Sequence, residues 1–168
     1  MVRIIGLDPG SRHTGYGVIE KHGSALLPLA YGRISCQQRL TLPQRITKLT
    51  ADLEQIIDRW EPERAALETP FHGFNTRSLI VLAQARGALL AVLGKRQLDI
   101  REFSPAEVKS AVAGQGRADK EQVAKMIGLI LSLRGKRLSR DATDALAVAV
   151  CCAQMHVYDR LTDPPNKL

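Results

Sequence analysis

The sequence predicts a mixed α/β domain built on a five-stranded sheet flanked by helices. An apolar, β-branched run over 2–8, stopped by a Pro-Gly pair, is typical of a buried strand. Strand patterns over 16–20 and 26–34 follow after short turns, so these three strands are expected to pair antiparallel. Short apolar runs at 64–68 and 98–103 then alternate with helical patterns, which indicates parallel strands joined by helices.

The helical patterns have recognisable starts and ends. Apolar residues at helical spacing form one stripe over 42–60, and Pro62 ends it. Ser104 and Glu107 match a capping box with proline at the first helical position. Ser139 is expected to cap the last helix. The predicted helices cover 42–60, 76–94, 105–114, 119–133 and 140–155.

Length and charge limit the function classes. The 168 residues fit a single domain, which we place at 1–160, followed by a flexible C-terminal tail at 161–168. The formal net charge of +7 favours an acidic partner, with nucleic acid ahead of an anionic membrane. No segment is expected to reach the ~20 apolar residues of a membrane span, and no signal peptide is recognised at the N-terminus.

Cysteine usage indicates a reducing compartment. Cys36, Cys151 and Cys152 are odd in number and contain no C-x-x-C pair. This pattern argues against a disulfide framework and against a structural zinc site, and we expect a cytoplasmic protein. The adjacent cysteines are interpreted as small core residues of the last helix.

Four carboxylates lie at strand ends or at a helix start, where they could come together. Asp8 and Glu68 each end a predicted buried strand, and neighbouring parallel strands end at the same edge of a sheet. Asp141 and Asp144 are three residues apart on a helix and therefore face the same way. Each also has a simpler interpretation. Asp8 can form a turn, Glu68 can be an exposed strand end, Asp141 can complement the helix dipole, and Asp144 can pair with Arg140.

If the last helix begins over the strand tips, the four carboxylates converge. Oxygen ligands without His or Cys suit hard cations, so we expect Mg²⁺, with Mn²⁺ as a substitute. Two such ions ~4 Å apart can activate a water and stabilise the leaving oxygen of a phosphodiester. A basic protein with an acidic metal site therefore has the profile of a nuclease.

Five segments, spread over nearly the whole chain, together resemble the RuvC family of bacterial Holliday-junction resolvases: LDPGSRHTGYG, ALETPF, QARGALL, VKSAVAGQGRADKEQV and DATDALAVAV. The resemblance implies an RNase H-like three-layer fold and a magnesium-dependent endonuclease that resolves four-way DNA junctions by paired symmetric nicks, leaving 5′-phosphates. It implies that the catalytic, metal-binding acids are Asp8, Glu68, Asp141 and Asp144.

The same resemblance implies the DNA contacts and the partners. Lys109 and Lys120 match family lysines near the cleaved strand, and Phe71 matches an aromatic residue that enters the junction centre. Arg117 lies in the same basic segment, and we add it to the expected DNA-binding residues. The family further implies a homodimer through the helix at 76–94, a short thymine-containing sequence at the cut, and cooperation with the RuvA–RuvB branch-migration complex.

Two other functions compete with this interpretation. The turn after Asp8 also resembles the phosphate loop of actin-like and sugar-kinase-like phosphotransferases, but those enclose a nucleotide between two such domains, and this chain is too short for two. A non-cutting nucleic-acid-binding module of the same fold is the other. Such a module would lack a complete set of acids, and here all four positions are acidic.

Overall fold

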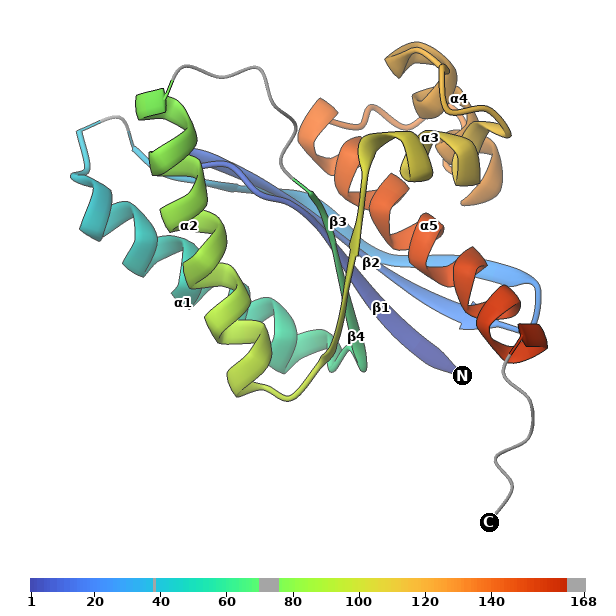
Figure 1. The fold of residues 1–168 in the computed structure, drawn as a ribbon, viewed down its shortest axis with the longest axis horizontal. Coiled ribbons are helices and arrows are strands. Elements are labelled where there is room, and N and C mark those ends of the chain that lie inside the picture. Colours follow the sequence, from blue (N-terminus) through green and yellow to red (C-terminus); the bar gives the residue numbers. More distant parts are fainter. Residues whose placement is uncertain (38, 70–75, 163–168) are drawn as a thin grey trace.

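The computed structural model describes residues 1–37, 39–69 and 76–162, and it contains the predicted five-stranded mixed sheet (Figure 1). Its strand order is β3-β2-β1-β4-β5, in which β1–β3 pair antiparallel and β1, β4 and β5 pair parallel. The elements are β1 (Val2–Asp8), β2 (His13–His22), β3 (Ala25–Ser35), α1 (Leu42–Trp60), β4 (Arg64–Glu68), α2 (Thr76–Lys95), β5 (Asp99–Phe103), α3 (Pro105–Ala113), α4 (Lys120–Ile130) and α5 (Arg140–Thr162).

The strands differ most from the prediction at β2, which begins at His13 rather than at residue 16. The extra residues are held by pairing with β3 and by Thr14, which is fully buried. β3 is an edge strand, so Pro28 is tolerated there because its missing N–H leaves no central ladder bond unmade. The register shifts between Val18 and Ile19, next to the proline's partner.

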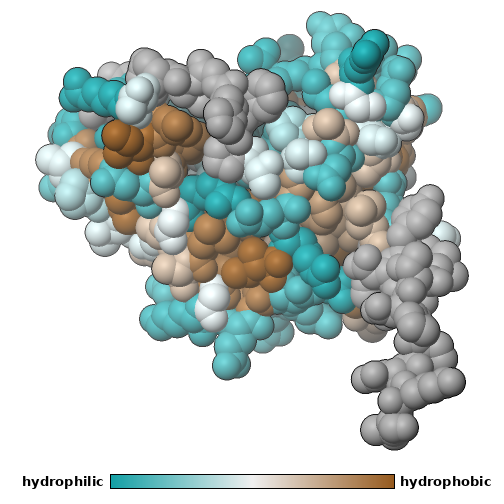
Figure 2. Space-filling view, in the orientation of Figure 1, coloured by the Kyte–Doolittle hydropathy of each residue, from teal (hydrophilic) through white to brown (hydrophobic). Residues whose placement is uncertain are grey.

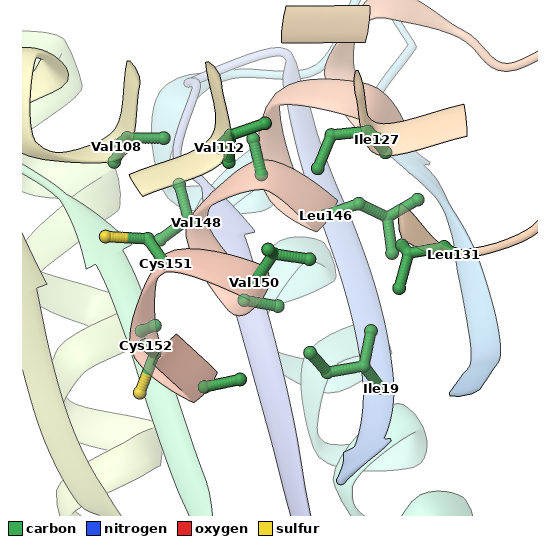
Figure 3. Close-up of a cluster of buried hydrophobic side chains, with 14 of the residues drawn as sticks. Ile19, Val108, Val112, Ile127, Leu131, Leu146, Val148, Val150, Cys151 and Cys152 are labelled. Atoms are coloured by element: carbon green, nitrogen blue, oxygen red, sulfur yellow. The ribbon is translucent and has the colours of Figure 1, made fainter. Parts of the chain in front are cut away.

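Helices cover both faces of the sheet and bury two apolar cores (Figure 1). α1 and α2 pack on one face, where Leu53 and Leu89 are fully buried. α3, α4 and α5 cover the other face, where Leu146 of α5 lies among the side chains drawn in Figure 3. The two predicted core cysteines, Cys151 and Cys152, are free and buried in this second core.

Glycines bring α5 close to the sheet. A β-carbon at Gly15 of β2 would lie 2.0 Å from the Asp141 carbonyl oxygen, and one at Gly6 of β1 would lie 2.1 Å from the Ala145 carbonyl oxygen. No side chain fits in such a space, so the first turns of α5 rest directly on the backbone of β1 and β2. This contact places the N-terminus of α5 at the edge of the sheet where β1 ends.

Two expectations need correction. α5 continues to Thr162, beyond the predicted end at 155 and into the segment expected to be a tail. Among the described residues, α2 is long and apolar enough to cross a membrane by length and composition, although no such segment was expected. Its apolar character arises because one side enters the core while Leu79 and Ile80 stay exposed, and Figure 2 shows the resulting hydrophobic area over the N-terminal half of α2.

Candidate active site

The strand tips place two acids side by side. β1 and β4 are parallel neighbours, and Leu7 is paired with Leu67 in their register. Asp8 and Glu68 are the next residues along each strand, so both end at the same edge of the sheet. Two carboxylates therefore meet where the sequence analysis expected them.

The first turn of α5 brings the other two acids to this edge. Ser139 caps the helix, because its hydroxyl accepts a hydrogen bond from the Ala142 N–H at 3.2 Å. Asp8 pairs with Gly15 across β1 and β2, and the Asp141 backbone rests on Gly15. The helix start therefore lies over the end of β1, and Asp144 follows one turn later on the same side.

The acids influence each other electrostatically. Burial raises the pKa of Asp8 to about 7, and repulsion from Asp144, Glu68 and Asp141 adds to the increase. Burial also raises the pKa of Glu68, with Asp144 as the second cause. These effects require the four carboxylates to share one region. The structure thus brings together all four sequence-predicted acids.

The turn that follows β1 does not depend on Asp8. Thr14 closes it, because its hydroxyl donates to the Gly10 carbonyl at 3.0 Å and accepts from the Gly10 N–H at 3.4 Å. Within the described residues, the Asp8 carboxylate makes no such hydrogen bond. The turn-forming interpretation of Asp8 is therefore not supported, and its half-buried carboxylate has no hydrogen-bond donor among the described residues.

Two of the predicted DNA-binding lysines lie near the acids. Lys120, at the start of α4, places its ammonium nitrogen 3.1 Å from an Asp144 carboxylate oxygen and stays 65% exposed. Lys109 on α3 is close enough to counteract the rise in the pKa of Glu68. Asp144 therefore pairs with Lys120 rather than with Arg140, the simpler alternative. Arg117 is exposed in the connection between α3 and α4.

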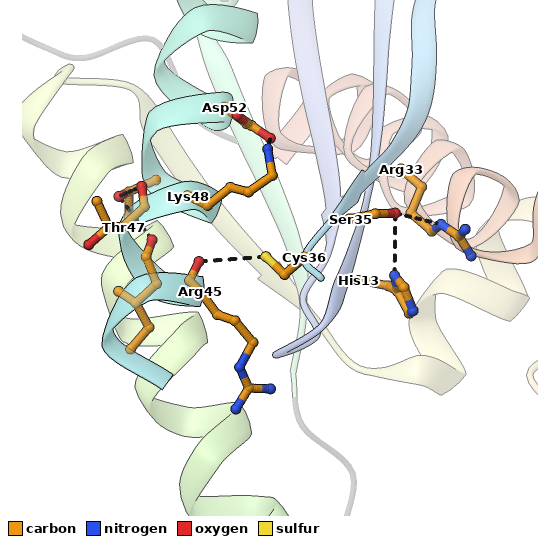
Figure 4. A network of polar contacts seen from close by, with 10 residues as sticks. His13, Arg33, Ser35, Cys36, Arg45, Thr47, Lys48 and Asp52 are labelled. Carbon is orange, nitrogen blue, oxygen red and sulfur yellow. Dashed lines mark hydrogen bonds and ion pairs between the residues drawn. The ribbon is translucent and has the colours of Figure 1, made fainter. Parts of the chain in front are cut away.

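Arg33 is a site residue that the sequence analysis missed. It lies on β3, and its guanidinium is 3.4 Å from the Asp141 carboxylate. Its Nε donates to the Ser35 hydroxyl at 3.0 Å, and the same hydroxyl is 3.3 Å from His13 Nδ1 (Figure 4). No sequence motif identifies Arg33, because it reaches Asp141 only through the packing of α5 against the sheet next to β3.

The donor set fits a hard divalent cation. The converging side chains offer carboxylate oxygens only, and a cation would relieve the repulsion that raises the pKa of Asp8 and Glu68. Within residues 1–37, 39–69 and 76–162, no three His, Cys, Asp or Glu side chains are already arranged as a ligand group. Two of the acids are instead paired with cations, Asp144 with Lys120 and Asp141 with Arg33.

One predicted site residue, Phe71, lies outside the described residues. The contacts of Lys109, Arg117 and Lys120 with DNA remain predictions. Lys109 lies on α3, Lys120 on α4 and Arg117 in the connection between them.

Comparisons with known proteins point to one family. Residues 4–152 match the family model described as crossover junction endodeoxyribonuclease RuvC. The RuvC of Chlorobium chlorochromatii is 44% identical over 148 residues, which cover 88% of this chain and 77% of that protein. The RuvC of Cupriavidus metallidurans is 43% identical over 152 residues, which cover 90% of this chain and 83% of that protein.

Solved structures show the same fold. T. thermophilus RuvC, solved in complex with a Holliday junction substrate, aligns with a TM-score of 0.87 at 28% identity and covers 96% of each chain. The yeast mitochondrial Holliday junction resolvase Ydc2 aligns with a TM-score of 0.70 at 14% identity, covering 95% of this chain and 82% of Ydc2. The second likeness concerns the fold alone.

Proposed function

This chain belongs to the RuvC family of crossover junction endodeoxyribonucleases, and we propose that it resolves Holliday junctions by metal-dependent hydrolysis at Asp8, Glu68, Asp141 and Asp144. The observation that carries the proposal is the convergence of these acids on one sheet edge, at electrostatic cost to the fold. A protein keeps such repulsion where the site is needed for function. Homologous recombination and DNA repair are the processes such an activity serves.

The acids would hold Mg²⁺, or Mn²⁺ in its place, with two ions in each site. Bound cations supply Lewis acidity, which activates a water and stabilises charge on the phosphodiester. In-line attack leaves 5′-phosphate and 3′-hydroxyl ends. The chain's own part is to fix the carboxylates on a strand edge and a helix terminus, because rigid elements hold ligand geometry better than loops.

Lys120 is suited to stabilise the phosphate during cleavage. It pairs with Asp144 and remains largely exposed. With Asp144 serving as a cation ligand, the lysine would be free to turn to a phosphate oxygen and offset the developing negative charge. Lys109 and Arg117, on the neighbouring α3 and its connection, would hold the DNA backbone of the same strand.

We further propose a homodimer formed through α2. Leu79 and Ile80 are exposed on this helix, and Ala83, Gly87 and Ala91 give it a small-residue surface that allows close approach. Two protomers related by a two-fold axis present two sites to a four-way junction, so each cuts one of two strands of like polarity. Phe71 precedes α2 in the chain and would enter the junction centre.

Cellular context completes the proposal. On the basis of the family and of the buried free cysteines, we propose cooperation with the RuvA–RuvB branch-migration complex, a thymine-containing preference at the cut and a cytoplasmic location. A phosphotransferase is disfavoured because residues 4–152 match the RuvC family model. A non-cutting module is disfavoured by the complete set of acids.

The proposal is tested by incubating the protein with four-way, nicked and linear duplex DNA, with Mg²⁺, with Mn²⁺ and with a chelator. We expect paired nicks in the four-way junction, and only with a divalent cation. Asp8→Asn and Glu68→Gln should abolish cutting while junction binding survives. Asp52→Asn, which removes an acid paired with Lys48 on α1, is the matched control and should cut normally. Cutting by either site variant at the wild-type rate would remove that acid from the proposed site.

A further inference from the structure

Near the acids lies a hollow that the proposed function does not use. It has a volume of about 470 Å³ and lies between α4, the connection from α4 to α5, and the first turn of α5. Its lining is mostly apolar and includes Leu129, Leu133 and Leu138. Its lining comprises Ala124, Lys125, Gly128, Leu129, Leu133, Arg134, Gly135, Lys136, Leu138 and Thr143.

The charges of this hollow are all positive. Lys125, Arg134 and Lys136 are exposed, and no Asp or Glu is among the lining residues. None of the three cations has an ion pair or side-chain hydrogen bond with another described residue, whereas Lys120 and Arg33 near the acids are both paired. Cations that have no ion-pair partner among the described residues and gather in one hollow attract an anion.

The hollow adjoins the proposed active site through two shared elements. Thr143 lines it and lies between Asp141 and Asp144 on α5. α4 begins with Lys120 at the acids and reaches the hollow at Lys125, about 7.5 Å further along the helix axis at 1.5 Å per residue. A DNA strand held at the acids therefore has its neighbouring nucleotides within reach of the hollow.

We propose that this hollow binds the backbone of the cleaved DNA strand next to the scissile phosphate. Phosphate oxygens are held by Lys125, Arg134 and Lys136, and a deoxyribose packs on Leu129, Leu133 and Leu138. The inference rests on the proposed function, since it takes the strand path from the acids. An acidic segment of a protein partner has similar charges, but the position beside the acids favours DNA.

The test compares Arg134→Ala/Lys136→Ala with Lys95→Ala/Arg96→Ala. The control pair removes the same formal charge from the last residue of α2 and the residue after it, which pair with Glu54 and Asp58 of α1. These residues lie near the start of β5, away from the edge where β4 ends with Glu68. Junction binding is measured from 50 to 200 mM salt with Ca²⁺ or a chelator, which prevents cutting. Losing two phosphate contacts should make the slope of log affinity against log salt shallower by about 1.8 for each hollow. The wild type should therefore lose about 12-fold more affinity over this range than the variant, for each hollow.

A second comparison tests whether the positive charge itself makes the contact. Arg134→Lys/Lys136→Arg should restore the salt slope, because the charge is kept. An unchanged slope in the alanine variant would overturn the inference and leave the acidic protein segment as the ligand to test. An equal change in the control pair would also overturn it. If the wild type shows the steeper salt dependence relative to the alanine variant but never cuts junctions, the proposed function fails instead.

Discussion

Replacing Asp8 with asparagine tests whether the acids strain the metal-free fold. Burial and three neighbouring carboxylates raise the pKa of Asp8 from 3.8 to about 7. A shift of about 3 units at about 1.4 kcal/mol each corresponds to about 4 kcal/mol. Because the folded pKa lies above the unfolded value, the protonated folded state is favoured. The stability that Asp8 contributes is fully present below pH 4 and is lost as the pH rises through about 7.

We therefore expect Asp8→Asn to be as stable as wild type near pH 4 in chelator and more stable at pH 8, by up to about 4 kcal/mol. Urea unfolding followed by circular dichroism measures the difference, and Mg²⁺ should stabilise the wild type at pH 8 but not the variant. Asp52→Asn, which breaks an exposed pair with Lys48, should show no comparable gain. Equal stability of Asp8→Asn and wild type at pH 8 would refute the electrostatic reasoning.

Two other substitutions probe the placement of α5 and the role of Arg33. Gly15→Ala puts a β-carbon 2.0 Å from the Asp141 carbonyl oxygen, so thermal unfolding should show a free energy of unfolding lower by ~1–3 kcal/mol or more, and cutting should be slower. Gly94→Ala, which has open space around it, should keep both its stability and its cutting rate. Retained stability in Gly15→Ala would mean that α5 does not rest on β2 there. Arg33→Ala removes a cation 3.4 Å from the Asp141 carboxylate, so calorimetry should show tighter Mn²⁺ binding, while Arg33→Lys should stay near wild type. Weaker Mn²⁺ binding in Arg33→Ala would mean that the arginine positions Asp141 rather than competing with the cation.

Much of the fold could be predicted from the sequence because its signals are local. β1, α1 and β4 have the predicted bounds, since a Pro-Gly stop, an apolar stripe and a short apolar run each act within a few residues. The capping box at Ser104 is also present, with the Glu107 N–H donating to the Ser104 hydroxyl at 3.3 Å. The start of β2 at His13 was missed because cross-strand pairing with β3, a non-local effect, extends the strand.

In the candidate site too, the residues identified by local sequence patterns were predicted, and those brought in by long-range contacts were not. Asp8 and Glu68 were predicted from strand ends, and Asp141 and Asp144 from helical spacing, so their convergence needed only the parallel pairing of β1 with β4 and the position of α5. Arg33 was not predicted, because its contact with Asp141 joins residues 108 positions apart that no pattern links. The hollow at Lys125, Arg134 and Lys136 was visible in the sequence only as an excess of basic residues.

Diffraction from crystals soaked in Mn²⁺, with the anomalous signal of the metal, would locate the cations. We expect manganese bound among the carboxylates of Asp8, Glu68 and Asp144, with Lys120 turned away from Asp144. Manganese found only elsewhere on the protein, with the Lys120–Asp144 pair intact, would contradict this expectation.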